Sequence, residues 1–263
     1  MAFAMNVAYL GIDLLHPVLD AVLREGCRVV KLFTCPTDNV TEFNTAVIAT
    51  ARERGIPWTM ERLTGEDLKE LERTCDLLLC AGYYYRVPVS PTLPMVNFHP
   101  APLPMGRGPW PMPVILLRGL PEGGITAHRM APELDRGDIL LEETFPIRRG
   151  ETLQSYMEQV YQRAPGMVHR LVTDLPGLLA QAKAQGEGDY WPSPTQEDWT
   201  VTPEMDVEQA DHILRAFYGY ECVYRAGERR TELIGGRAEA GDNKAQPFPV
   251  RGGFIRAERI RNL

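Results

Sequence analysis

Residues 76–81 read DLLLCA, a run that is apolar at every position after the first. A strand of this composition has both faces covered, which is typical of a parallel sheet with helices on either side. Other runs rich in apolar and β-branched residues predict further strands, at residues 6–12, 28–34, 56–59 and 95–98. Segments with helical spacing of apolar residues lie between them, at residues 16–26, 43–54 and 68–74. The alternation predicts an α/β fold with a doubly wound, mostly parallel, Rossmann-like sheet.

The second half of the sequence continues this pattern and changes character near residue 185. Strands are predicted at 124–130 and 139–144, and a long helix over 152–179 is predicted to break near Pro165-Gly166. A polar stretch with Pro and Gly, GEGDYWPSPTQEDW, then indicates a linker. One more helix and several alternating runs follow, at residues 207–217, 221–224, 230–234, 237–240 and 253–260. We therefore predict a main domain over 1–185 and a linker with a small β-rich appendage over 186–263.

The composition is that of a soluble globular protein with an excess of acidic residues. The 263 residues include 28 Lys and Arg and 35 Asp and Glu, so the formal net charge is −7. This balance argues against a broad surface for binding polyanions. The five cysteines form no CxxC pair, so we expect reduced thiols in a cytoplasmic protein. The N-terminus lacks a basic leader region, and no apolar run approaches the ~18 residues of a membrane span.

Residues 96–104, VNFHPAPLP, place two polar side chains at the end of a predicted strand. Asn97 and His99 are two apart, so on an extended strand they face the same side. The prolines that follow direct the chain out of the sheet as a stiff loop. Ligands of open α/β sheets bind beyond the carboxyl ends of the strands, which favours a functional role for this pair. The alternative is that Asn97 caps a turn and that His99 is a hydrogen-bonded, half-buried histidine.

An acidic partner for this pair is expected in the segment LDRGDIL. Asp138 follows Gly137 and directly precedes an apolar strand, whereas Asp135 is explained as a turn residue, so we favour Asp138 over Asp135. Asn, His and Asp together suit the attack of a neutral amine on a carbonyl group, because they supply an oxyanion donor and a proton acceptor. No serine occurs in a GxSxG elbow, and no HxxxH or HxH spacing suggests a metal site, so no metal is expected.

Two stretches of the sequence resemble a known protein family. VNFHPAPLP-MGRGPWPMPVILLRG and GITAHRMAPELDRGDIL are similar to the formyltransferases that use 10-formyltetrahydrofolate. That family includes methionyl-tRNA, glycinamide ribonucleotide and sugar N-formyltransferases. Its hallmark is Asn-x-His followed by a Leu-Pro loop and then an acidic L-D-x-G-D-I segment. The resemblance implies that residues 1–185 form a formyltransferase catalytic domain and that Asn97, His99 and Asp138 carry out catalysis.

The resemblance also implies a mechanism and a place for the formyl donor. The acceptor amine attacks the formyl carbon, Asn97 and His99 stabilise the oxyanion, and Asp138 orients or charges His99 and helps to move the proton to the folate nitrogen. Whether His99 or Asp138 takes the amine proton is left open. The pterin of 10-formyltetrahydrofolate is expected against the strand-end loops, near these residues: Arg86, Val87, Leu134, Asp135, Gly137 and Asp138.

The acceptor is expected to be a small-molecule amine, such as a nucleotide-linked amino sugar, held near Arg107 and Trp110. For both residues a role in packing at a helix entry is the alternative. The acidic balance argues against tRNA, so methionyl-tRNA formylation is the second hypothesis. Hydrolysis of formyltetrahydrofolate and a non-catalytic nucleotide-binding module are further alternatives, and the module lacks a GxGxxG signature. No membrane partner is expected, and a homodimer is left open.

Overall fold

The computed structural model describes residues 5–262 and divides into two compact units. The first unit comprises the chain up to Arg107, Gly124–Thr144 and Gln159–Asp189. The second comprises Gly108–Gly123, Phe145–Glu158 and the chain from Tyr190 onward. Two segments of the predicted main domain therefore belong to the second unit. The boundary at 185 remains a prediction, and the first four residues of the N-terminal segment lie outside the described part.

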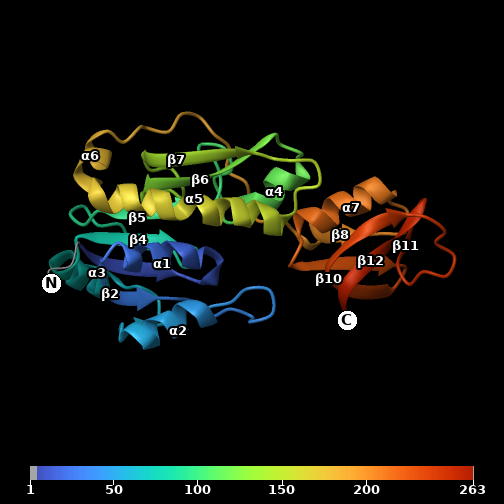
Figure 1. The fold of residues 1–263 in the computed structure, drawn as a ribbon, viewed down its shortest axis with the longest axis horizontal. Helices are drawn as coiled ribbons and strands as arrows, with labels where there is room; N and C mark the ends of the chain where they lie inside the picture. Colours follow the sequence, from blue (N-terminus) through green and yellow to red (C-terminus); the bar gives the residue numbers. More distant parts are fainter. Residues whose placement is uncertain (1–4, 263) are drawn as a thin grey trace. The chain divides into compact units, whose positions relative to one another are not determined.

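The first unit is built on a seven-stranded sheet with the order β3-β2-β1-β4-β5-β6-β7 (Figure 1). The strands span β1 Asn6–Gly11, β2 Arg28–Phe33, β3 Trp58–Thr59, β4 Leu77–Ala81, β5 Met95–His99, β6 Glu122–Arg129 and β7 Ile139–Pro146. Pairing is parallel from β3 through β5, whereas β6 runs antiparallel to β5. The predicted doubly wound, mostly parallel α/β fold is confirmed.

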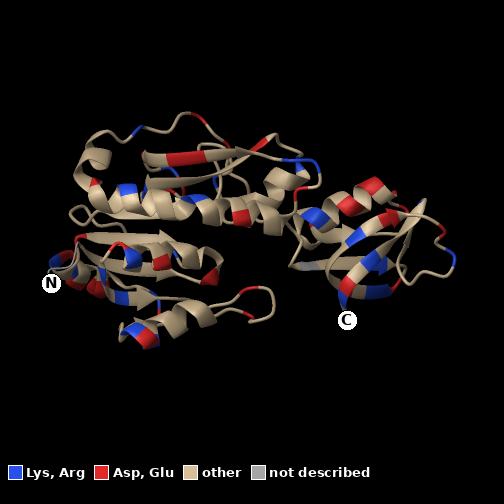
Figure 2. Ribbon diagram, in the orientation of Figure 1, with Lys and Arg blue, Asp and Glu red and all other residues tan. Residues whose placement is uncertain are grey.

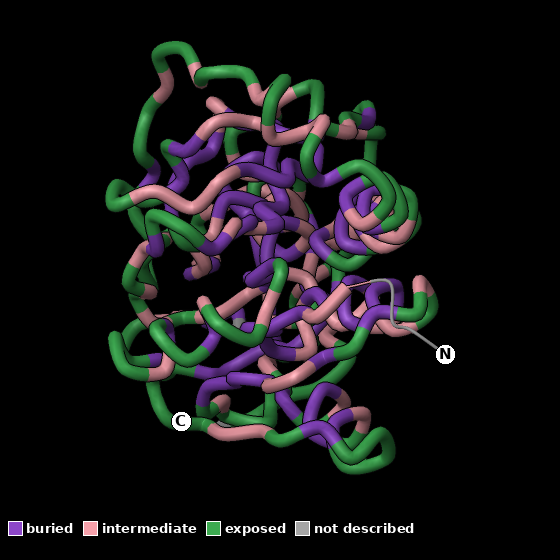
Figure 3. The backbone as a smooth tube through the Cα atoms, turned by 90° about the vertical axis from the view of Figure 1, so that its left-hand side faces the viewer, coloured by how far each residue is buried: buried purple, intermediate pink, exposed green. Residues whose placement is uncertain are grey.

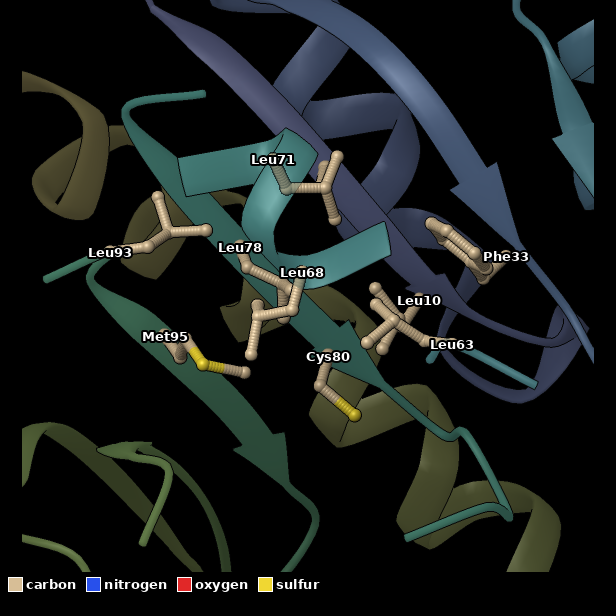
Figure 4. Packing of buried hydrophobic residues seen from close by; sticks show 10 residues of the cluster. Leu10, Phe33, Leu63, Leu68, Leu71, Leu78, Cys80, Leu93 and Met95 are labelled. Atoms are coloured by element: carbon tan, nitrogen blue, oxygen red, sulfur yellow. The ribbon is translucent and has the colours of Figure 1, made fainter. Parts of the chain in front are cut away.

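Helices cover both faces of this sheet. They span α1 His16–Arg24, α2 Thr45–Arg54, α3 Gly65–Thr74, α5 Leu153–Thr173 and α6 Leu175–Ala180. Helices α1 and α5 lie over one face (Figure 1), and α3 lies over the other (Figure 4). Leu68 and Leu71 of α3 pack on Leu78 of β4 and Met95 of β5 within one buried cluster. Figure 3 shows the buried segments running through the interior, with exposed residues along the outer loops.

Two helical predictions differ from the structure. Helix α5 continues through Pro165, and the break predicted there occurs instead at Asp174, whose carboxylate accepts a hydrogen bond from Gly177 N and caps α6. A helix that the periodicity did not predict, α4, spans Pro111–Leu117, because prolines in its first turn need no backbone donor. Within residues 5–262, none of the helices is both long and apolar enough to cross a membrane.

The second unit contains a five-stranded sheet with the order β11-β12-β10-β9-β8. Its elements are β8 Thr200–Val201, α7 Val207–Ala216, β9 Glu221–Ala226, β10 Arg229–Ala240, β11 Pro249–Val250 and β12 Gly253–Asn262. The runs predicted at 230–234 and 237–240 form one strand, because Gly235 and Gly236 carry the chain between them at positive φ. The predicted β-rich appendage is thus present. Helix α7 is tied to α4 by His212 Nε2, which lies 2.9 Å from Leu117 O.

Candidate active site

The candidate site begins on two paired strands of the first unit. In the register of β5 and β6, Asn97 lies opposite His128 and His99 lies opposite Thr126. Because side chains alternate along a strand, these four side chains share one face of the sheet. Met95 packs into the buried cluster under α3 on this same face. The polar residues therefore lie next to that cluster, closer to the carboxyl end of β5. The sequence predicts that Asn97 and His99 share a face, and the neighbouring strand β6 adds two more polar side chains to that face.

Asp135 completes the group from the loop between β6 and β7. Its side chain is buried, and its Oδ1 lies 3.4 Å from Asn97 Nδ2, 3.5 Å from His128 Nε2 and 3.6 Å from His99 Nδ1. The backbone of Asp135 has φ +54°, in the left-handed region that residues with a Cβ avoid. This conformation is associated with the inward position of the carboxylate, and strained residues of this kind cluster at functional sites.

The hydrogen bonds of His99 fix its tautomer. Nε2 lies 2.7 Å from the carbonyl oxygen of Gly106, which can only accept, so Nε2 carries a proton. Nδ1 is therefore the nitrogen that gains or loses a proton, and it faces Asp135. Burial lowers the pKa of His99 below 6.5, Asp135 opposes this shift, and His128 adds to it. A neutral His99 with a free lone pair on Nδ1 is the resulting form at neutral pH.

Hydrogen bonds also fix the tautomer of His128 and the orientation of the Asn97 amide. His128 Nδ1 lies 2.8 Å from the carbonyl oxygen of Arg129, so this nitrogen donates and Nε2 is the acceptor in the neutral ring. Asn97 Nδ2, at 3.1 Å, can then donate to His128 Nε2. The amide of Asn97 is thereby oriented with its donor side toward Asp135. His128 is 2 % exposed, so its ring is buried beside Asn97 and Asp135.

The structure brings Asn97 and His99 together with Asp135 and not with Asp138. Asp138 is only partly buried, and its backbone oxygen accepts a hydrogen bond from Arg129 N at 2.9 Å. This pairing closes the connection between β6 and β7, and the contacts between His99 and a carboxylate come from Asp135 alone among the described residues. The preference for Asp138 rested on its place before a strand. The role of Asp138 remains a prediction, but it is the turn at Asp135 that points a carboxylate toward His99 and Asn97.

The residues predicted to hold the folate lie on two connected loops. Arg86 Nη2 donates to Pro132 O at 2.9 Å and so joins the loop after β4 to the loop after β6. Val87 packs partly against the buried cluster under α3, whereas Leu134 is a large apolar side chain that remains 56 % exposed. Gly137 lies against the backbone of Arg129, where a Cβ would approach Arg129 O to 1.9 Å. The two loops therefore offer a joined, partly apolar surface.

The two residues predicted to contact the acceptor have other surroundings. Arg107 is 2 % exposed, and its guanidinium donates to Gln185 Oε1, Gly186 O and Gly188 O at 2.9–3.0 Å. These bonds occupy the side chain, so the substrate-binding prediction for Arg107 is not supported by its position. Trp110 precedes α4 in the second unit and packs against three aromatic rings, edge-on with Trp199 and Phe217 and tilted with Tyr220. Packing at a helix entry, the alternative for both residues, describes the contacts of Trp110, whereas Arg107 binds residues 185–188.

Sequence reasoning missed Thr126, which shapes the loop after His99. Its hydroxyl donates to Ala101 O at 2.7 Å and accepts from Leu103 N at 3.1 Å. The available signal was the alternation in ITAHR, which places Thr126 and His128 on one face. Among the described residues, no group of His, Cys, Asp and Glu has the arrangement of a metal site. The site thus offers an amide donor, a titratable imidazole and a carboxylate within reach of one another.

Known proteins resemble this chain in sequence and in fold. Residues 36–172 match the family model described as formyl transferase. Methionyl-tRNA formyltransferase of Treponema denticola is 29% identical over 166 residues, which cover 60% of this chain and 52% of that protein. The chain therefore spans about half the length of that relative.

Solved structures show the same fold at low sequence identity. HypX of Aquifex aeolicus in complex with tetrahydrofolic acid superposes with a TM-score of 0.71 at 17% identity, over 98% of this chain and 44% of that one. A sugar N-formyltransferase from Shewanella sp FDAARGOS_354 superposes with a TM-score of 0.69 at 17% identity, over 90% and 99% of the two chains. The family model covers more than half of the sequence, and from this match we conclude that the chain belongs to the formyl transferase family.

Proposed function

We propose that this protein transfers a formyl group from 10-formyltetrahydrofolate to the amine of a small molecule. The observation that carries the proposal is the convergence of Asn97, His99 and Asp135 at the end of β5, with the Asp135 carboxylate 3.4–3.6 Å from both partners. Such distances in the free protein are compatible with bonds that tighten when substrate binds. An amide donor, an imidazole and a carboxylate are the groups that an amine–carbonyl reaction requires.

The chemistry can be written in two steps. The neutral amine attacks the formyl carbon, a C–N bond forms, and the carbonyl oxygen becomes an oxyanion. This oxyanion accepts a hydrogen bond from Asn97 Nδ2 in place of the 3.4 Å contact with Asp135 Oδ1. The bond from carbon to the folate N10 then breaks, and a proton passes from the former amine to N10. His99 Nδ1 and Asp135 Oδ1 face each other at 3.6 Å and supply the proton-accepting groups for this passage. Because Nε2 of His99 is held by Gly106 O, the proton moves through Nδ1.

The loops after β4 and β6 fit a folate donor. Tyr84 and Leu134 present large apolar side chains that are 48 % and 56 % exposed, and Arg86 holds the two loops together through Pro132. Exposed apolar surface of this kind suits a planar ring system. The solved HypX complex with tetrahydrofolic acid has the same fold, which supports a folate-derived donor.

Charge pairing in the second unit supports a small acceptor. Arg225 makes two bonds to Glu197, at 2.8 and 3.0 Å, and Glu239 accepts from both Arg237 and Arg256. Arg251 lies 3.2 Å from Asp206. Acidic and basic residues are interleaved over these strands (Figure 2). Arginines paired in this way are poorly available to phosphates, and a polyanion such as tRNA would have to displace the carboxylates.

A second candidate, formylation of methionyl-tRNA, is favoured by the name of the Treponema denticola relative. The test is an acceptor panel with 10-formyltetrahydrofolate, in which release of tetrahydrofolate is followed with amino sugars, nucleotide-linked amino sugars, charged initiator tRNA, or no amine. We expect release that depends on a small amine. Release with tRNA alone would establish the second candidate, and equal release without amine would indicate a hydrolase.

The same assay tests the proposed roles of Asp135 and His99. We expect Asp135→Asn and His99→Asn to lower kcat by about 100-fold or more, since each removes a group that handles the proton. Asp138→Asn is the matched control, three residues from Asp135, and should stay within about threefold of wild type. Comparable losses at both aspartates would contradict the assignment of Asp135.

A further inference from the structure

Gln185 joins the two parts of the chain that hold the candidate catalytic groups. Its Nε2 donates to Asp135 O at 2.9 Å and to Gly137 O at 2.6 Å, and its Oε1 accepts from Arg107 Nε at 3.0 Å. The two carbonyl oxygens can only accept and the guanidinium can only donate. The Nε2 of Gln185 must therefore face the carbonyl oxygens, and its Oε1 must face Arg107. The side chain therefore has one orientation in which every bond is made.

Arg107 extends these contacts toward His99. It follows Gly106, whose carbonyl oxygen holds His99 Nε2 at 2.7 Å. Its guanidinium also binds Gly186 O and Gly188 O, so the segment that carries Gln185 is fixed to the loop that orients His99. One connected set of hydrogen bonds thus runs from the support of His99 to the backbone of Asp135.

The backbone of Asp135 needs such support. Its φ of +54° is unfavourable for a residue with a Cβ, and conformations of this kind persist only where surrounding contacts over-determine them. The two bonds from Gln185 bracket Arg136, because they reach the carbonyl groups on either side of it. Gly137 packs on the Arg129 backbone, which fixes the other side of the turn.

We propose that Gln185 is a positioning residue for formyl transfer, which holds the turn at Asp135 so that its carboxylate faces His99. Arg107 orients Gln185 and ties the turn to the loop at Gly106. This role explains why the N–H groups of the buried Arg107 donate to oxygen atoms of the protein. The inference rests on the proposed function of Asp135 and His99. The simpler reading, that Gln185 only anchors residues 185–188, predicts a loss of stability without a change at Asp135.

The test uses two substitutions that separate these readings. Gln185→Glu keeps an oxygen acceptor for Arg107 and so keeps the anchor, but it removes both donors to Asp135 O and Gly137 O. Gln185→Met keeps the length of the side chain and removes every polar bond. Gln181→Met is the matched control, since Gln181 is exposed at the end of α6. Turnover with a small acceptor, thermal unfolding and the NMR titration of His99 are measured for each variant.

We expect kcat to fall about 10- to 100-fold in Gln185→Glu and Gln185→Met, with KM for the acceptor within about threefold, because displacement of a catalytic group by about 1 Å has costs of this size. The pKa of His99 should fall further in Gln185→Met, because Asp135 raises it in the wild-type protein. Gln181→Met should match wild type in every measurement.

Two results would overturn the inference. The first is wild-type turnover in folded Gln185→Glu, and the second is an unchanged His99 titration in folded Gln185→Met. The titration requires no turnover, so it tests the inference even where the acceptor proves different. If no amine supports release of tetrahydrofolate, the proposed function fails, and if His99→Asn and Asp135→Asn retain full activity, the proposed roles of these two residues fail. Their inactivity together with an active Gln185→Glu removes only the role of Gln185.

Discussion

His99 is held in a form that suits both proton acceptance and donation. The Gly106 carbonyl fixes one ring nitrogen, and the other faces the Asp135 carboxylate at 3.6 Å. Burial lowers the pKa of this imidazole, so it is neutral in the resting protein and must be charged at a cost in free energy. This cost makes the protonation of His99 visible in the pH dependence of stability.

The pH prediction follows from linkage. Because the pKa of His99 is lower in the folded than in the unfolded chain, the unfolded chain binds more protons below pH 6.5. The contribution of His99 is therefore fully present above pH 6.5 and is lost as the pH falls through the region below it. A single proton contributes at most about 1.4 kcal/mol per pH unit.

We expect the free energy of unfolding to fall less steeply between pH 7 and pH 5 in His99→Asn than in the wild-type protein. Urea unfolding at a series of pH values measures both slopes, and the comparison concerns the slopes and not the absolute stability. Gln181→Met, at an exposed position without a titratable group, is the control and should keep the wild-type slope. Parallel profiles for wild type and His99→Asn would contradict the assigned burial effect.

At the scale of elements, helix α2 has its N-terminal cap supplied from another part of the chain. Its own N-cap residue, Asn44, makes no side-chain capping bond. Asp13, in the turn after β1, instead accepts hydrogen bonds from Ala46 N and Val47 N, each at 2.9 Å. A carboxylate at a helix N-terminus satisfies free donors and interacts favourably with the helix dipole. The contact fixes α2 against the carboxyl end of β1.

We expect Asp13→Ala to lower the free energy of unfolding by about 1–2 kcal/mol, since two backbone donors lose a charged acceptor. Asp13→Asn keeps one oxygen acceptor and should lose less. Urea unfolding with an unchanged m-value would locate the effect in stability and not in compactness. Asp13→Ala with wild-type stability would show that water replaces the carboxylate at no cost.

At the scale of the whole molecule, acidic residues outnumber basic ones, and the formal net charge is −7. Arg225, Arg251 and Arg256 of the second unit add little free positive charge, because each lies beside a carboxylate. A surface of this kind attracts polyanions weakly, and few condensed counterions would be released on contact. The charge distribution thus bears on the acceptor and not on the chemistry.

We expect initiator tRNA to bind no tighter than ~10 μM at 150 mM salt, within the range of non-specific association. Fluorescence titrations at several salt concentrations measure both the affinity and its salt slope. A poly-anionic control such as heparin should bind equally weakly. Nanomolar binding of tRNA with a steep salt slope would contradict this expectation and favour the tRNA hypothesis.

The sequence by itself determined most strands and helices of the parallel sheet and the placement of Asn97 and His99 on one strand. Continuous apolar runs and helical spacing specify such elements locally, and two residues of a strand that are two apart must share a face. Local rules also explain the errors. Pro165 is tolerated within α5, and the break occurs where Asp174 can cap the next helix.

Only the tertiary structure decided which acid joins the site. Asp135 and Asp138 belong to one loop, and their order in the sequence does not tell which carboxylate turns inward. That depends on a backbone conformation at Asp135 held by Gln185, 50 residues farther along the chain, and on His128 from the strand next to Asn97. Contacts between distant segments form only in the folded chain, and for this reason the pair on β5 could be predicted and its acidic partner could not.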